Sequence, residues 1–214
     1  GRAMKKMKCL VLVLVLALSA WTLSGCGGMS EDEAKEYAQA VLDASYKGEF
    51  DSYMELTDST EEEAREMYEG NMDATMAAVG FEEMGASQEM QADYRQLFLD
   101  MAKLAKYSLG EVTEIEDGFE IQVKVEPFIG LDGLETELTD SLMAQLSESG
   151  EIPGDEELNQ MTMETMYDLM QDRLEAPEYG EAETVTIRVT ADADNVYSIP
   201  EEDTTALDNA LFPM

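Results

Sequence analysis

The side chains that could carry chemistry in this 214-residue sequence are mostly carboxylates, since it has 48 Asp and Glu, 13 Lys and Arg, two Cys and no His. Without His, neither a Ser-His-Asp triad nor a Cys-His pair can be built in its usual form, and no metal site can use imidazole. The formal net charge of −35 would repel a phosphate backbone, because nucleic-acid binding depends on Lys and Arg. The composition therefore excludes nucleic acid as a partner and argues against most familiar enzymes.

Paired carboxylates are the first candidates for catalysis, because glycoside hydrolysis needs only two acids at a defined separation. Acidic runs occur at residues 61–63, 82–83, 155–157 and 201–203. Each run lies at or near a predicted helix start, where acids complement the helix dipole. We interpret them as solvated helix caps and expect no enzymatic activity. A hydrolase ranks third among the possible functions, after binding of a ligand or protein partner and after metal handling.

Two groups could bind a metal. Oxygen ligands in the turn Asp192-Ala193-Asp194-Asn195 suit Ca²⁺, although this turn lacks the other ligands and the Gly of an EF-hand loop. Thioethers select Cu(I), and four of the 16 Met lie close together: Met161, Met163, Met166 and Met170. Their spacing of three and four residues also predicts an adaptable core stripe. We expect no specific metal site and no cofactor. Weak divalent-cation binding by the acidic surface stays open.

The first 26 residues carry the strongest motif. A basic stretch at residues 4–8 precedes an apolar run of about twelve residues from Cys9 to Ala20, in the order typical of a secretory signal. This run is shorter than the roughly 20 residues that a spanning helix needs. Leu23-Ser24-Gly25-Cys26 follows directly and resembles a bacterial lipoprotein lipobox. The resemblance implies cleavage between Gly25 and Cys26 and a diacylglycerol on the Cys26 thiol.

We therefore expect three parts: a signal peptide at residues 1–25, the lipidated Cys26 with a short tether at 26–30, and one domain at 31–214. Residues 1–3 precede the expected initiator and are an expression remnant or the product of an upstream start. Acyl chains contribute about 0.8 kcal/mol per buried methylene, so the protein should be tethered to the extracytoplasmic face of the cell membrane without spanning it. An ordinary signal peptide or a membrane anchor, with Cys26 incidental, is the alternative.

Hydrophobic periodicity predicts helices in the first half of the domain. Apolar residues recur at three- and four-residue spacing over about 31–47, 50–56, 62–79 and 88–105. Ser30 with Glu33 and Ser59 with Glu62 form predicted capping boxes, and Ser87 is a predicted cap. The same spacing returns over 131–149 and 158–174, with a break at 150–154, and a short helix is expected at 203–211.

Two hairpins are predicted by alternation of apolar and polar residues. The first runs over 112–125 and turns at Asp117-Gly118, while the second pairs residues 184–190 with 196–199. Helices combined with antiparallel hairpins predict an α+β domain whose helices pack on one face of the sheet.

The chain resembles a family of small, mostly uncharacterised lipoproteins of gut Firmicutes. The resemblance rests on the lipobox, on residues 34–37 through 47–53, and on the closing residues 194–199. It implies a nuclear-transport-factor-2/cystatin-like cone, in which N-terminal helices pack on a curved antiparallel sheet. Residues 131–176 would then be a helical insertion between two hairpins. No functional residue comes with the resemblance.

These observations lead to two expected functions. The first is a lipid-anchored, non-enzymatic protein that binds an unidentified small molecule or protein partner. In a cone fold, Tyr37, Tyr53, Tyr68 and Tyr94 could line a cavity, although such residues more often belong to the core. The second is extracytoplasmic metal handling, of Cu(I) by the Met residues or of Ca²⁺ by the acidic turn.

Overall fold

The structure is a computed structural model, and it describes residues 21–22 and 28–214. Gly25 and Cys26, with most of the predicted signal peptide, lie outside the described residues. In chain order the elements are β1 (Trp21–Thr22), α2 (Glu31–Leu42), the π-helix η1 (Asp43–Lys47), α3 (Asp51–Thr57), α4 (Glu61–Val79), α5 (Gln88–Ala102), β2 (Lys106–Ile115), β3 (Gly118–Glu126), α6 (Leu134–Ser149), α7 (Asp155–Glu175), β4 (Glu183–Ala191), β5 (Val196–Ser198) and α8 (Glu201–Leu211).

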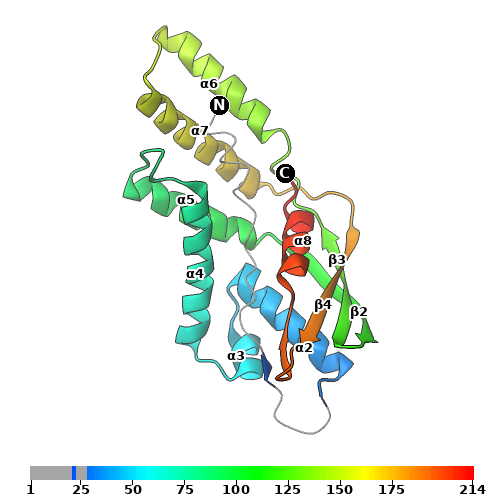
Figure 1. Ribbon diagram of the computed structural model, residues 1–214. Coiled ribbons are helices and arrows are strands. Elements are labelled where there is room, and N and C mark those ends of the chain that lie inside the picture. The colour runs from blue at the N-terminus through cyan, green and yellow to red at the C-terminus, as the bar shows by residue number, and fades with distance from the viewer. Residues whose placement is uncertain (1–20, 23–27) are drawn as a thin grey trace.

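The sheet has the order β1-β5-β4-β3-β2, and all neighbouring strands are antiparallel. One of its faces is apolar and buried, and carries Phe119, Ile121, Val123, Val125, Ile187 and Val189. Helix α2 contacts β2 and β3, while α8 contacts β4 and β3, so these helices lie beside the sheet in Figure 1. The predicted α+β class with an antiparallel sheet is confirmed.

Strand β1 belongs to the segment that the lipobox predicts to be removed. Trp21 pairs with Tyr197 and Thr22 with Val196, at the outer side of β5. Cleavage before Cys26 would take β1 away and leave a sheet of β5, β4, β3 and β2.

No helix among the described residues is long and apolar enough to cross a membrane.

The second capping box lies one residue later than predicted. Thr60 accepts a hydrogen bond from the backbone N–H of Glu63, and the Glu63 carboxylate accepts one from the backbone N–H of Thr60. The predicted cap, Ser59, instead shares a hydrogen bond of 2.7 Å with the Thr57 hydroxyl. Thr60 is the last residue with extended backbone angles, so α4 begins after it. The predicted caps Ser30 and Ser87 are confirmed.

The first hairpin also turns one residue earlier than predicted. Ile115 pairs with Gly118, so Glu116 and Asp117 form the turn and Gly118 is the first residue of β3. Strand β2 begins at Lys106, six residues before the predicted start at Val112. A bulge between Leu109 and Val112 shifts the register. The bulge interrupts the alternation of apolar and polar residues, so the first half of the strand was not predicted.

Helices α6 and α7 connect β3 to β4 and form a hairpin that projects from the body (Figure 1). Tyr94 of α5 holds the middle of α7, because the centre of its buried ring lies 5.5 Å from that of Tyr167 and its hydroxyl donates to the Met163 carbonyl. Arg173 of α7 donates to the carbonyl oxygens of Gly130 and Asp132, at 2.7 and 2.8 Å. The hairpin is thus fixed at its base, while its turn at 150–154 extends away from the sheet.

The close approach of β3 to β4 predicts a strong requirement for Gly118. A Cβ at this position would lie 2.0 Å from the Val189 carbonyl oxygen, so Gly118→Ala should lower the free energy of unfolding by about 1–3 kcal/mol. Urea unfolding measures this change. Gly110→Ala is the matched control, because its Cβ would meet nothing closer than the Gln122 carbonyl oxygen at 3.5 Å. Equal stability of the two variants would contradict the packing argument.

Candidate functional site

The Met residues proposed for copper lie in the hydrophobic core. Met163, Met166 and Met170 are 2–6% exposed, and Met161 is half-buried against the same core. Helix α7 packs on α5 along this stripe. Packing therefore accounts for their positions, and no feature of the described residues opens the stripe to an ion.

The acidic turn proposed for calcium is closed by one of its own carboxylates. Asp192 Oδ1 accepts hydrogen bonds from the backbone N–H groups of Asp194 and Val196, at 2.8 and 3.1 Å. Asn195 has a left-handed backbone, with φ +60°. Residues 21–22 and 28–214 contain no group of three Cys, Asp or Glu side chains placed to hold a metal ion. Asp192 thus has a structural role in joining β4 to β5.

The four Tyr residues considered as cavity lining belong to the core or its rim. Tyr37, Tyr53 and Tyr94 are at most 1% exposed, and Tyr68 is half-buried with its ring 5.4 Å from Phe50. Tyr37 donates to the Tyr197 carbonyl at 3.3 Å. None of the four lines the surface hollows at the edge strand β2, between α4 and α5, or at the turn between α6 and α7.

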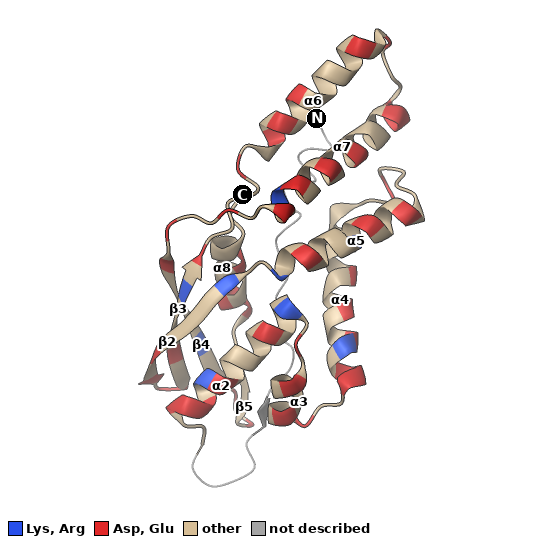
Figure 2. Ribbon diagram, turned by 180° about the vertical axis from the view of Figure 1, so that it is seen from behind, with Lys and Arg blue, Asp and Glu red and all other residues tan. Residues whose placement is uncertain are grey.

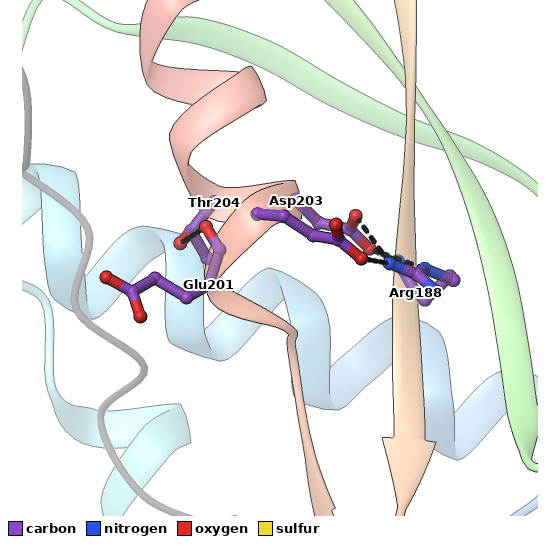
Figure 3. Close-up of polar contacts among 5 residues, drawn as sticks. Arg188, Glu201, Asp203 and Thr204 are labelled. Atoms are coloured by element: carbon purple, nitrogen blue, oxygen red, sulfur yellow. Dashed lines mark hydrogen bonds and ion pairs between the residues drawn. The ribbon is translucent and has the colours of Figure 1, made fainter.

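The acidic run at 201–203 is not only a solvated cap, because two of its carboxylates form ion pairs with β4. The Asp203 carboxylate, 12% exposed, accepts from the backbone N–H of Arg188 at 2.8 Å and from the Arg188 guanidinium at 3.0 and 3.1 Å (Figure 3). Glu202 forms a second ion pair with Arg188. These hydrogen bonds raise the pKa of Arg188, and they fix the start of α8 against β4. The runs at 61–63 and 155–157 occupy the first turns of α4 and α7 as expected.

Asn71 of α4 carries a buried amide without a hydrogen-bond partner in the part of the chain that the structure describes. Buried polar groups are normally paired, so this amide is a polar group that needs an explanation. It does not line any of the three hollows. Asn71 therefore defines no site by itself.

A surface hollow of about 310 Å³ at the edge strand β2 brings together cations that are scarce elsewhere in the domain. We call it the β2 hollow, and it is lined by Gln39, Asp43, Lys47, Ala105, Lys106, Tyr107, Ser108, Lys124 and Glu126. Four of the 13 Lys and Arg precede Cys26, which leaves nine in residues 26–214 against 48 acids. Three of these nine line the hollow. Figure 2 shows that Asp and Glu far outnumber Lys and Arg along the helices.

Hydrogen bonds hold one wall of the β2 hollow in place. The Asp43 carboxylate accepts from the Tyr107 hydroxyl at 2.6 Å and from the Gln39 amide at 3.0 Å. Lys47 Nζ donates to the carbonyl oxygens of Ala105, at 2.6 Å, and Lys103. Burial lowers the pKa of Lys47, and the neighbouring Asp43 partly opposes that shift. This wall is therefore formed before any ligand arrives.

The other wall presents two exposed ammonium groups. Lys106 lies opposite Glu126 in the β2–β3 ladder, and Ser108 lies opposite Lys124. Lys106 Nζ is 4.1 Å from the centre of the Tyr179 ring, a cation–π contact that orients the ammonium group. Two ammonium groups and the Ser108 hydroxyl can thus donate to one anion. Neither the lysines nor the hollow was predicted from the sequence, because Lys47, Lys106 and Lys124 are far apart in the chain.

No protein-family model and no curated protein matches this sequence. Among solved structures, the crystal structure of a candidate lipoprotein (ycdA) from Bacillus subtilis is similar, with a TM-score of 0.61 and 10% sequence identity. The match covers 86% of this chain and 58% of that one, so this chain spans little more than half the length of its neighbour. The likeness shows a shared fold.

The buried Tyr residues predict alkaline unfolding. Burial raises the pKa of Tyr37, Tyr46, Tyr94 and Tyr107 above the ordinary value near 10. Their contribution to stability should be complete below about pH 10 and lost above it, by up to about 1.4 kcal/mol per pH unit for each Tyr, because only the unfolded state releases these protons. The lowered pKa of Lys47 has the opposite effect on the pH dependence of stability, but it is one group against four Tyr residues.

Tyrosinate absorbance and circular dichroism, followed together as the pH is raised, measure this effect. We expect part of the absorbance change to coincide with unfolding. Titration of all nine Tyr near pH 10 in a folded protein would contradict the prediction.

Proposed function

We propose that this protein is a non-enzymatic, extracytoplasmic lipoprotein that binds a small anion in the β2 hollow. The observation that carries the proposal is the gathering of Lys47, Lys106 and Lys124 at one hollow, in a domain with nine cations and 48 acids. Carboxylates outnumber cations 48 to nine in residues 26–214, so an anion finds few other places with net positive charge. The three lysines outnumber the two carboxylates of the hollow, Asp43 and Glu126.

The anchor part of the proposal rests on the lipobox and on where the domain begins. Met29 is already buried in the core, at 7% exposure. Three residues of extended chain reach at most about 11 Å, so a lipid on Cys26 would hold the domain directly at the membrane surface. The absence of a spanning helix among the described residues is compatible with such a tether.

The chemistry of the hollow favours a carboxylate or a phosphate as the ligand group. Lys106, Lys124 and Ser108 offer donors from one side, and charge-assisted hydrogen bonds to ammonium groups are the stronger kind. Asp43 and Glu126 would oppose a ligand of high negative charge. Metal handling is the weaker alternative, because the thioethers of α7 lie in the core and Asp192 closes a turn.

The anchor is tested by cell fractionation. Replacing Cys26 by Ser should abolish labelling by radioactive palmitate and move the protein out of the membrane fraction, because the thiol is the proposed acylation point. Cys9→Ser is the matched control and should keep both properties, since Cys9 precedes the predicted cleavage site. Unchanged membrane association of the Cys26→Ser protein would show that another segment anchors it.

The ligand site is tested by titration of the mature chain, carrying Cys26→Ser for solubility, with inorganic phosphate and with succinate. Backbone amide NMR shifts should cluster in β2 and β3. The double variant Lys106→Gln, Lys124→Gln should weaken binding about tenfold or more, because each charged hydrogen bond contributes about 1.5–3 kcal/mol.

Lys35→Gln supplies the control for charge, because Lys35 is an exposed lysine of α2 that does not line the hollow. Its affinity should match that of the parent protein at equal ionic strength. Equal weakening by both sets of substitutions would mean that anions respond only to net charge, and the β2 hollow would then not be the site.

A further inference from the structure

The turn between α6 and α7 carries the most exposed large apolar side chain of the described residues. Ile152 is 98% exposed and Met143 is 62% exposed. Burying an aliphatic side chain of this size contributes about 1.5–3 kcal/mol, so leaving Ile152 in water forgoes a sizeable stabilisation. Isolated apolar residues are common on protein surfaces, but Met143 of α6 and Ile152 of the turn line the same hollow.

Ile152 and Met143 border a built hollow. It has a volume of about 320 Å³, and its other apolar lining comes from Leu146 and Pro153. Gly150 ends α6 with a left-handed backbone, φ +68°, and its N–H donates to the Leu146 carbonyl at 3.1 Å. The Ser149 hydroxyl donates to the same carbonyl at 3.2 Å. These bonds set the turn that presents Ile152.

The surroundings of this apolar hollow carry one sign of charge. From residue 134 to residue 172 the chain has eleven Asp and Glu and no Lys or Arg. Five of these acids flank the hollow in sequence and are exposed: Glu148, Glu151, Asp155, Glu156 and Glu157. An apolar hollow within such a field complements a basic partner that also supplies an apolar side chain.

Position and charge both argue against a membrane surface or a second copy of this chain as the occupant of the hollow. The turn lies at the end of the molecule opposite the start of α2, and therefore away from the proposed anchor (Figure 1). An anionic membrane surface would meet the carboxylates with like charge, and so would the same hairpin of a second copy.

We propose that the α6–α7 turn is a docking surface for a basic protein segment, which places one aliphatic or aromatic side chain against Ile152 and Met143 and its Lys or Arg groups near the five acids. Each part of the surface then has a function. The apolar hollow gives affinity, and the carboxylates select partners by charge and raise the rate of encounter.

The experiment measures fluorescence anisotropy of a short amphipathic peptide of Lys and Leu pairs with the mature chain carrying Cys26→Ser. We expect Ile152→Ser to weaken binding about tenfold, since it removes one buried aliphatic contact. The substitution cannot unfold the domain through lost packing, because Ile152 contacts almost only water. Met214→Ser is the matched control, as Met214 is 60% exposed at the C-terminus, and it should bind as the parent does.

Four further measurements complete the test. A peptide with Ser in place of Leu keeps the charge and should bind much more weakly, and the double variant Lys106→Gln, Lys124→Gln should bind the Lys/Leu peptide normally. Equal binding by the Ile152→Ser and Met214→Ser proteins would overturn the proposal, because attraction would then come from net charge alone. Binding to anionic vesicles, or self-association, that is lost in Ile152→Ser would also overturn it in favour of a membrane or a second copy.

Discussion

The constraint behind this structure is the scarcity of cations in a domain covered by carboxylates. Most of the arginines are placed where two elements meet: Arg188 joins β4 to α8, Arg173 joins α7 to the segment after β3, and Arg95 joins α5 to α4. Lys47 bonds η1 to the carbonyl oxygens that follow α5. A cation at a junction reduces repulsion where acidic elements approach each other.

Buried Tyr residues provide neutral links of the same kind. Tyr94 bonds to the Met163 carbonyl across 69 residues of chain, and Tyr46 bonds to Asp208 across 162. Tyr107 bonds to Asp43 beside the β2 hollow. A phenol buries a large apolar ring and also satisfies a polar partner, so it joins distant elements without adding charge. Tyr is the commonest aromatic of this chain, with nine residues against six Phe and one Trp.

Local patterns in the sequence predicted the fold class and most helices, but they failed where a distant neighbour decides the outcome. The Asp117-Gly118 pair looks like a hairpin turn, yet Gly118 is needed in β3 because Val189, 71 residues later, approaches its backbone. The bulge after Leu109 concealed half of β2 in the same way. Asp203 looked like an ordinary cap because Arg188 lies on another element. The β2 hollow was missed because its lysines meet only after folding.

The two proposed binding surfaces are built from different elements, and this separation matters for what the fold can support. The β2 hollow depends on α2, η1, β2 and β3, which belong to the body with the sheet. The α6–α7 turn extends from a hairpin held by Tyr94 at the middle of α7 and by Arg173 at its base. Substitutions at the turn can change a partner without disturbing the hollow. A fold shared at 10% identity with a longer neighbour is consistent with this division, because buried patterns determine the architecture and exposed residues determine the contacts.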